Sequence, residues 1–215
     1  EGTYTESNLT ISDDLNISAI GDVIWDANGQ RAFSMATGDV SISNITFING
    51  NHTSYGHLIR IDGDSIAFED CKFISNGGNV TGTNGVIYVN MANANFTNCH
   101  FENNTAGTGT SYGLISLKDS ILLVDGCTFV NNYNKNGCIY VSGSSTGSIA
   151  VINNTKFIGN NATSASGGSG GAIYASGSMA YQYSNGTVRP GAQSTVYVVD
   201  CDFIDNTAYG GTYYS

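Results

Sequence analysis

Hydrophobic residues recur along the chain in short runs of strand length, and three sequence marks repeat with them in a fixed order. The first mark is a phenylalanine followed three residues later by Asn or Gly. The second is a glycine that opens a short apolar run, as in Gly85–Val89 and Gly137–Val141. The third is an alternating segment before each phenylalanine, such as Thr195–Cys201. Both apolar marks have the length and composition of β-strands.

The phenylalanine marks set the period of the repeat. Successive marks are separated by 26, 28, 28, 28 and 46 residues, and they are Phe47, Phe73, Phe101, Phe129, Phe157 and Phe203. No helical pattern lies between them, and the corners are rich in Gly, Asn and Ser. Strands repeated in the same order satisfy their backbone groups by stacking in parallel, about 4.8 Å per turn. The pattern predicts an all-β fold, a right-handed parallel β-helix of about six or seven coils of about 28 residues.

The repeats predict one β-helix domain over residues 1–215. Residues 32–215 carry the repeats, with Ala32–Met35 aligned to His57–Arg60, and residues 1–31 are expected to form an N-terminal coil or cap. The long interval before Phe203 holds 18 extra residues, which predicts an inserted loop at 176–193. No stretch reaches the roughly 18 apolar residues of a membrane span, so we expect none in this segment.

Equivalent positions of a solenoid stack, so the repeat predicts ladders of identical side chains. Buried amides are expected to hydrogen-bond to each other and to the corner backbone. The asparagine ladder consists of Asn76, Asn104, Asn132 and Asn160. Two residues before the phenylalanines lies a column of small, inward-facing residues, which contains Ile45, Cys71, Cys99, Cys127, Thr155 and Cys201.

The five cysteines include no CxxC or CxxH pair, which argues against zinc or redox chemistry. Stacked cysteines have nearly parallel Cβ vectors, which suit disulfide geometry badly, and Thr155 separates Cys127 from Cys201. We therefore expect all five thiols to be reduced, with Cys138 alone on another face and the others acting as small hydrophobic residues.

Composition narrows the classes of function. The chain has 17 acidic and 7 basic side chains, a net charge of −10, which argues against nucleic acid as a partner. Its 28 glycines and 25 asparagines are poor helix formers and exclude a helical bundle. Hydrophobic residues make up 40% of the chain, enough for one sizeable core.

Charged residues are too scattered to predict catalysis. The densest group is Arg60, Asp62 and Asp64, whose Asp- and Gly-rich surroundings are typical of a turn. The alternative is a polysaccharide lyase or glycoside hydrolase, which requires charged groups converging on one face near Arg60 or Lys118. The three histidines assemble no triad or metal set. We expect no catalytic residue, no metal site and no cofactor.

The inserted stretch offers the candidate binding residues Tyr181, Tyr183 and Arg189. Insertions in solenoids become protruding loops, and Tyr and Arg are favoured at recognition sites. A tolerated insertion without a partner is the alternative.

Ten Asn-x-Ser/Thr sequons occur where chance gives about five, an excess that indicates glycosylation outside the cell. Asparagines in strands or corners have a structural explanation instead. The candidate glycosylation sites are Asn8, Asn51, Asn79, Asn103, Asn161 and Asn185.

The Phe-x-x-Asn, Gly-[Ala/Val/Leu]-Ile and Asn-x-Thr-Phe marks, with Asp26–Phe33 ahead of them, resemble the β-helix repeats of methanogen adhesin-like surface proteins. They are also similar to the repeats of polymorphic membrane proteins. The resemblance implies a piece of a larger archaeal surface protein, located outside the cell or in its envelope. It also implies an anoxic setting, which suits unpaired cysteines.

From this resemblance we expect a non-enzymatic cell-adhesion module that binds a cell-surface glycan or a protein of another cell. Pectin-lyase-like enzymes share the architecture, so the fold alone does not decide the function. A third hypothesis is a structural rod or filament segment that associates end to end, because the ends of a solenoid expose open strand edges.

Overall fold

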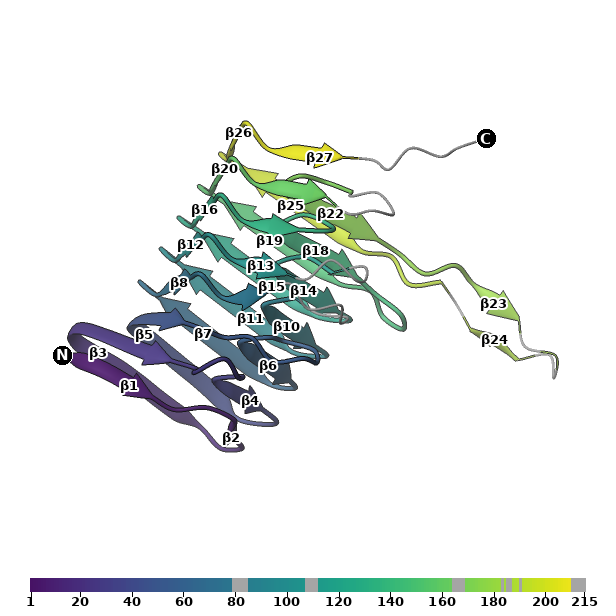
Figure 1. Ribbon diagram of the computed structural model, residues 1–215. Helices are drawn as coiled ribbons and strands as arrows, with labels where there is room; N and C mark the ends of the chain where they lie inside the picture. Colours follow the sequence, from purple (N-terminus) through teal and green to yellow (C-terminus); the bar gives the residue numbers. More distant parts are fainter. Residues whose placement is uncertain are drawn as a thin grey trace.

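The chain forms a parallel β-solenoid in which successive coils stack along one axis (Figure 1). This computed structural model describes residues 1–78, 85–106, 112–163, 169–182, 184, 187–189 and 191–209. Every regular element among these residues is a β-strand. The all-β parallel solenoid expected from the repeat is therefore confirmed.

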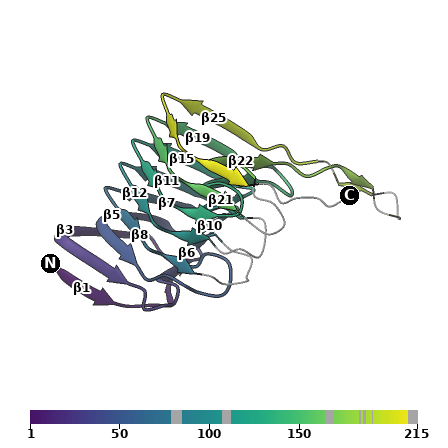
Figure 2. The same ribbon diagram turned by 45° about the horizontal axis from the view of Figure 1, so that its top comes forward.

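Sheet I is a 13-stranded sheet that bends once, so that it has two halves. The strands of its first half, side by side in Figure 2, are β7 (Ser65–Glu69), β11 (Asn93–Thr97), β15 (Ile121–Asp125), β19 (Ile149–Asn153) and β25 (Thr195–Val199). The strands of its second half are β8 (Lys72–Ile74), β12 (His100–Glu102), β16 (Thr128–Val130), β20 (Lys156–Ile158) and β26 (Asp202–Ile204). The N-terminal strands of this sheet are β1 (Gly2–Thr5), β3 (Leu15–Asp26) and β5 (Asp39–Ile48), and the last two run through both halves.

Two further sheets close the solenoid. Sheet II consists of β2 (Leu9–Ile11), β4 (Phe33–Met35), β6 (Ile59–Asp62), β10 (Ile87–Asn90), β14 (Ile115–Lys118), β18 (Ile139–Ser142) and β22 (Ile173–Ser176). Sheet III consists of β9 (Gly77–Gly78), β13 (Thr105–Ala106), β17 (Tyr133–Asn134), β21 (Asn161–Thr163) and β27 (Thr207–Tyr209). A separate antiparallel pair, β23 (Tyr181–Gln182) and β24 (Val188–Arg189), projects from the coils (Figure 1).

The solenoid has about five turns, slightly fewer than the six or seven coils expected. Only five strands form sheet III, whereas sheet II has seven. The N-terminal strands β1 to β5 pair only within sheets I and II, so the first coils have fewer strands than the later ones.

The phenylalanines stack along the core. Consecutive rings from Phe47 to Phe203 lie 4.4 to 5.3 Å apart and within 9° of parallel. A second pair, Phe68 and Phe96, stacks at 5.0 Å and meets Phe73 edge to face. Five of the six marked phenylalanines are fully buried, while Phe203 in β26 is 49% exposed.

The asparagine ladder closes the corner between sheets I and III. The side-chain oxygen of Asn104 accepts hydrogen bonds from the backbone N–H of Asn76 at 2.9 Å and from its amide at 3.1 Å. The Asn104 amide in turn donates to the Phe73 carbonyl at 2.8 Å and to Asn132 at 2.9 Å. Asn206 continues the ladder beyond Asn160. Each buried amide therefore pairs with the coil before and the coil after it.

Backbone geometry explains why Asn and Asp are so frequent at the bend of sheet I. The residue before the column of small side chains has a positive φ in each coil: Asn44, Asp70, Asn98, Gly126, Asn154 and Asp200, with values from 49 to 64°. Asn, Asp and Gly adopt this conformation more readily than other residues. Gly126, which takes the place of the usual Asn or Asp, therefore adopts the same backbone conformation as its counterparts in the other coils.

The cysteine column lies in the core behind this bend. The Cys99 N–H donates to the Cys127 sulfur at 3.3 Å, and the Cys127 N–H donates to the Thr155 hydroxyl at 3.3 Å. A hydroxyl thus takes the place of a thiol in the same column. All five cysteines are free thiols, and only Cys201 is partly exposed.

The alignment of the first repeat is wrong by one residue. Phe33 pairs with Ile59 and Met35 with Ile61, whereas the sequence marks align Phe33 with Leu58. A one-residue shift exchanges the buried and exposed faces of a strand. Phe33 and Met35 are both fully buried in the observed register.

We predict that replacing one rung of the asparagine ladder destabilises the fold. Asn104→Ala leaves the Phe73 carbonyl and the Asn76 N–H without these partners, and such losses cost about 2–4 kcal/mol. Urea unfolding followed by circular dichroism measures the change. The control Asn93→Ala, at an exposed position of β11, should cost less than about 0.5 kcal/mol, and equal losses would refute the special role of the ladder.

We also predict that thiol reactivity separates Cys201 from the other cysteines. Buried thiols react slowly, so a colorimetric thiol reagent should label Cys201 first and Cys71, Cys99, Cys127 and Cys138 only on unfolding. Cys201→Ser should remove the fast phase. A fast phase that survives this substitution would contradict the burial of the other four thiols.

Candidate functional site

A row of five tyrosines lies on the outward side of sheet II, four of them partly exposed and one, Tyr88, only 5% exposed. The strand register places Tyr88, Tyr140 and Tyr174 at the same outward position of β10, β18 and β22. Two more come from the loops before β6 and β14, namely Tyr55 and Tyr112. We call these five residues the tyrosine stripe.

Tyr112 fills the one gap in this row. The register puts Ser116 of β14 between Tyr88 and Tyr140. Ser116 is small and buried, and its hydroxyl hydrogen-bonds to the backbone of Gly113 at 3.1 Å. The Tyr112 ring lies 6.2 Å from Tyr88 and 5.9 Å from Tyr140, nearly perpendicular to both. A loop tyrosine thus restores the aromatic row that the strand lacks.

The stripe is closely packed from end to end. The Tyr55 ring lies 4.8 Å from Tyr88 and 5.7 Å from Tyr112, and Tyr140 stacks on Tyr174 at 5.6 Å. Burial, followed by the neighbouring Tyr55, raises the pKa of Tyr88 to about 12. Burial and a hydrogen bond with Tyr55 also raise the pKa of Tyr112. Both phenols are therefore neutral at physiological pH and can donate or accept hydrogen bonds.

A column of polar side chains runs beside the stripe, two residues further along each strand. Its members are Asp62, Asn90, Lys118, Ser142 and Ser176. The Asn90 amide donates to Asp62 at 3.0 Å, and the hydroxyls of Tyr140 and Ser176 are 3.0 Å apart. Sheet II thus presents aromatic rings flanked by hydrogen-bonding groups, a combination common in binding sites.

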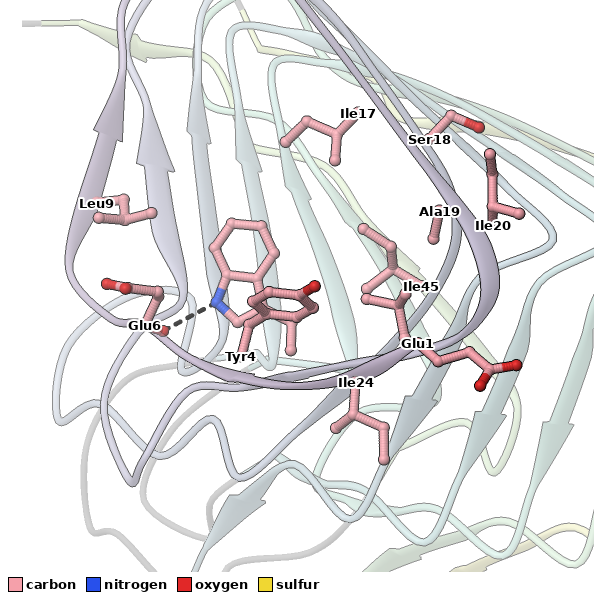
Figure 3. Close-up of a pocket in the computed structure, with 12 residues that line it drawn as sticks. Glu1, Tyr4, Glu6, Leu9, Ile17, Ser18, Ala19, Ile20, Ile24 and Ile45 are labelled. Carbon is pink, nitrogen blue, oxygen red and sulfur yellow. Dashed lines mark hydrogen bonds between the residues drawn. The ribbon is translucent and has the colours of Figure 1, made fainter.

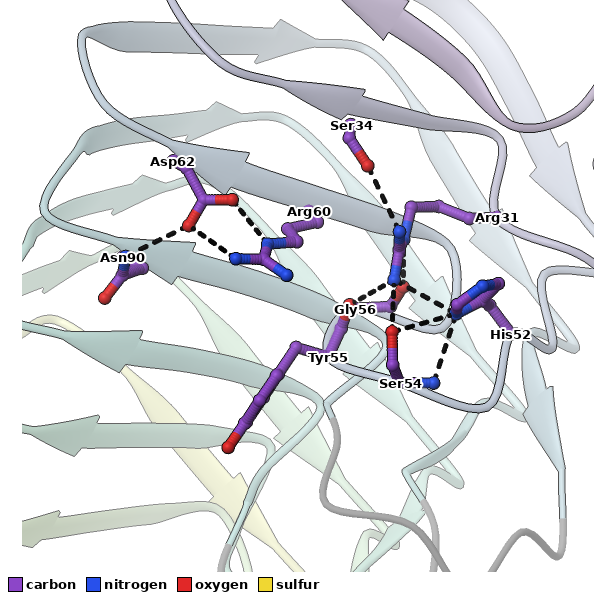
Figure 4. A network of polar contacts seen from close by, with 9 residues as sticks. All are labelled: Arg31, Ser34, His52, Ser54, Tyr55, Gly56, Arg60, Asp62 and Asn90. Carbon is purple, nitrogen blue, oxygen red and sulfur yellow. Dashed lines mark hydrogen bonds and ion pairs between the residues drawn. The ribbon is translucent and has the colours of Figure 1, made fainter.

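Arg31 fixes the loop that carries Tyr55 (Figure 4). Its guanidinium donates to the carbonyls of Tyr55 at 2.7 Å and Gly56 at 3.0 Å, and to the Ser54 hydroxyl at 2.9 Å. It also lies 3.0 Å from Nδ1 of His52. We call residues 51–56 the clamp loop, since contacts from the preceding coil hold it.

The charged group considered for catalysis does not converge. Arg60 and Asp62 form an ion pair on β6, but Asp64 lies at the next corner and accepts a hydrogen bond from the Gly38 N–H at 2.8 Å. Lys118 shares the outward column of Asp62, separated from it by Asn90. These residues therefore do not form the paired carboxylates and base that the hydrolase or lyase hypothesis requires.

A groove of about 730 Å³ lies at the corner between sheet II and the first half of sheet I. Asp64, Met91, Asp119, Ile121 and Ile149 contribute to its walls. The Asp119 carboxylate accepts hydrogen bonds from four consecutive backbone N–H groups at 2.9 to 3.0 Å, those of Ser144, Ser145, Thr146 and Gly147. Asp119 therefore organises the loop that follows β18, and its carboxylate is fully engaged there.

An apolar cavity of about 460 Å³ opens at the N-terminal end of the solenoid (Figure 3). Tyr4, Ile17 and Ile45 line it, and the Trp25 indole donates to the Glu6 carbonyl at 2.8 Å. It coincides with a register shift between Ser18 and Val23, where β3 has extra residues opposite β5. Its lining is mostly aliphatic, so it offers few groups that could orient a polar ligand.

The predicted binding residues of the insertion lie on the projecting hairpin. Tyr181 and Arg189 are register partners in β23 and β24, and Ser178 bridges to Ala192 at its base. Tyr183 lies outside the described residues. The insertion and the tyrosine stripe thus involve different parts of the molecule, and binding by the hairpin stays a prediction.

The candidate glycosylation sites differ in exposure. Asn8, Asn51 and Asn103 are exposed, Asn161 is partly exposed, and Asn79 and Asn185 lie outside the described residues. Asn103 has a φ of 53°, so backbone geometry alone accounts for an asparagine there. Glycosylation of these residues stays a prediction.

No cluster of three or more His, Cys, Asp or Glu side chains suited to a metal ion occurs in the described part of the chain. A helix long and apolar enough to cross a membrane is also absent from the described residues.

Sequence reasoning missed the tyrosine stripe. Its signal was present, because the residue after the recurring isoleucine of the glycine-opened runs is Tyr88, Tyr140 or Tyr174 in three of the five. The contributions of Tyr55 and Tyr112 come from loops, whose path the repeat does not specify. Arg31 and the clamp loop were missed for the same reason.

The fold and this surface define the chain as a parallel β-solenoid with an aromatic face. No family model matches it, and no curated protein and no solved structure matches it.

We predict that the loop held by Asp119 loosens in acid. Burial by itself raises the Asp119 pKa, but hydrogen bonds from the Ser145, Ser144 and Gly147 backbone and the Ser144 hydroxyl bring it well below its usual value. This stabilisation is present above the ordinary pKa of 3.8 and is lost as the pH falls further. Hydrogen exchange at Ser145 and Gly147 measures it. Asp119→Ala, which removes the acceptor, should raise exchange already at pH 7, and unchanged exchange would rule out the anchoring role.

Proposed function

We propose that the chain is a non-enzymatic attachment module of a cell-surface or envelope protein, which binds an extended polymer along the tyrosine stripe. The observation that carries the proposal is the unbroken row of five tyrosines beside a polar column on one face of a stacked scaffold. Tyrosine supplies a large contact area at low entropic cost, together with a hydroxyl for hydrogen bonding.

The shape of the stripe favours an extended ligand. It runs from the loop before β6 to β22, so it follows the solenoid axis across successive coils. Neighbouring rings are 4.8 to 6.2 Å apart, which exceeds the roughly 3.3–3.6 Å spanned by one extended amino-acid residue and is closer to the length of one sugar ring in a linear chain. A linear glycan can therefore meet a similar surface at each coil. The net charge of −10 disfavours polyanions.

The state of the charged groups supports binding without turnover. Arg60 and Asp62 neutralise each other at the end of the stripe, and Asp64 is engaged with the backbone. A glycosidase needs two carboxyl groups facing one bond, one of them protonated. A location outside the cell belongs to the same proposal and is supported by the sequons and by the resemblance of the repeats to adhesin-like proteins.

End-to-end association of this 215-residue segment is a second candidate, favoured by the apolar residues that its last coil exposes. Val198 is 44% exposed and Phe203 is 49% exposed. Asp200, Asp202 and Asp205 lie close to them in the sequence and oppose contact with another acidic end. Sedimentation velocity over a hundredfold concentration range would reveal such association.

The test combines a glycan and polysaccharide array with a turnover assay on neutral and anionic polysaccharides. We predict binding without turnover, and a loss of at least about tenfold in affinity for Tyr140→Ala, equivalent to about 1.4 kcal/mol. The matched control is Tyr197→Ala, an exposed tyrosine on sheet I, which should leave the affinity unchanged. A third variant replaces residues 179–191 of the hairpin by two glycines.

Each contrary outcome would assign binding or activity to other residues. Loss of binding only in the shortened hairpin would assign recognition to the insertion. Equal losses in Tyr140→Ala and Tyr197→Ala would show that the stripe is not the contact surface. Release of unsaturated or reducing products would make the protein an enzyme and direct attention to Arg60 and Asp62.

A further inference from the structure

We propose that Arg31 and His52 form a pH-sensitive clamp that holds Tyr55 in the tyrosine stripe and releases it in acid. As a means of regulating ligand binding, this inference rests on the proposed function. As a statement about the clamp loop, it stands on the contacts of Arg31 and His52 and can be tested without a ligand.

Arg31 is the centre of the clamp. It precedes β4, one coil before the clamp loop, and its donors reach two consecutive loop carbonyls, those of Tyr55 and Gly56. Its remaining contacts are the hydroxyls of Ser34 and Ser54 and the His52 ring. Arg31 has no ion pair among the described residues, so its charge is balanced by dipoles and by a neutral histidine rather than by a carboxylate.

The geometry at His52 fixes its protonation state. Nδ1 lies 3.0 Å from the Arg31 guanidinium and accepts the Ser54 backbone N–H at 3.1 Å. Guanidinium and backbone N–H groups can only donate, so Nδ1 must be the unprotonated acceptor of a neutral ring. A proton on Nδ1 would abolish both hydrogen bonds and place a second cation against Arg31. The closed loop therefore requires neutral His52.

The surroundings of His52 raise the free energy of its protonated, cationic form. His57 is fully buried, and neither of its ring nitrogens has a hydrogen-bond partner among the described residues. Facing the cluster from β6 are Arg60 and Asp62, which pair with each other, and the phenols of Tyr55 and Tyr88 lie beside them. The Asp62 carboxylate is thus already occupied by Arg60.

A fall in pH favours the open state of the loop at both histidines. Burial, and then Arg31, lowers the pKa of His52, while burial, His52 and Arg31 lower the pKa of His57 to about 4. A group with a lowered pKa on folding binds a proton more readily in the open state. The stabilisation of the closed loop is therefore complete above about pH 6.5 and decreases as the pH falls toward 4.

Opening of the clamp loop would alter one end of the stripe. The Tyr55 ring packs 4.8 Å from Tyr88 and 5.7 Å from Tyr112, and the hydrogen bond from Arg31 holds its backbone carbonyl. The tyrosines of β10, β18 and β22 are fixed by strand pairing instead. Acid would thus remove Tyr55 from the contact surface and leave the other end of the stripe in place.

The test is hydrogen exchange at the His52 and Ser54 amides of the ligand-free protein between pH 7.5 and 4.5, corrected for intrinsic exchange. In the wild type we expect protection of these two amides to fall at least tenfold between pH 7 and 5. His52→Asn should keep its protection at pH 5, because the asparagine Oδ1 can take the place of Nδ1 and does not titrate. His100→Asn, which changes a half-exposed histidine on sheet I, should behave like the wild type.

Protection of the β11 and β15 amides reports an intact fold in every variant, so local opening is distinguished from unfolding. Wild-type protection that persists at pH 5 would overturn the proposal. So would an acid-induced loss of equal size in His52→Asn, which would assign the effect to His57 or to another group. No polymer enters the experiment, so its result is independent of the array outcome.

Discussion

Hydrogen bonding between identical side chains of successive coils is the interaction on which the rest of the structure depends. At the corner between sheets I and III, each buried asparagine amide satisfies backbone and side-chain groups of its neighbours. These contacts place an asparagine at the same height in each coil from Asn76 to Asn206, beside phenylalanines that stack at 4.4 to 5.3 Å. Because each coil contacts mainly the coils beside it, stability is close to a sum of nearest-neighbour terms.

The repeat sufficed to predict the parts of the fold that are set by this stacking. Strand order, the inward phenylalanines and the small residues at the bend all follow from residues that recur at one position per coil. The pairing of Phe33 with Ile59 did not follow, because the first coils lack the asparagine mark and hydrophobic residues alone fit two registers. The predicted binding residues Tyr181 and Arg189 occupy a projecting hairpin, but the sequence could not show what they contact.

The candidate site combines residues whose positions follow from the repeat with residues whose positions do not. Tyr88, Tyr140 and Tyr174 are positioned by strand register and could be found from the repeat. Tyr55 and Tyr112 reach the same row from loops, and their place depends on contacts such as the hydrogen bonds of Arg31 and the small size of Ser116. Such contacts join residues from different coils without any recurring pattern. The strand tyrosines thus form a fixed platform, and the loop tyrosines can be adjusted individually.

The position of the long insertion has a consequence for how this molecule can change over generations. The corner between sheets II and I takes two residues after β14, six after β18, and the whole projecting hairpin after β22. The strands on either side keep their register throughout. Mutations that lengthen or shorten this corner are therefore separated from the ladders that hold the coils together. Natural selection can diversify the outer loops of such a chain while its interior stays under strict constraint.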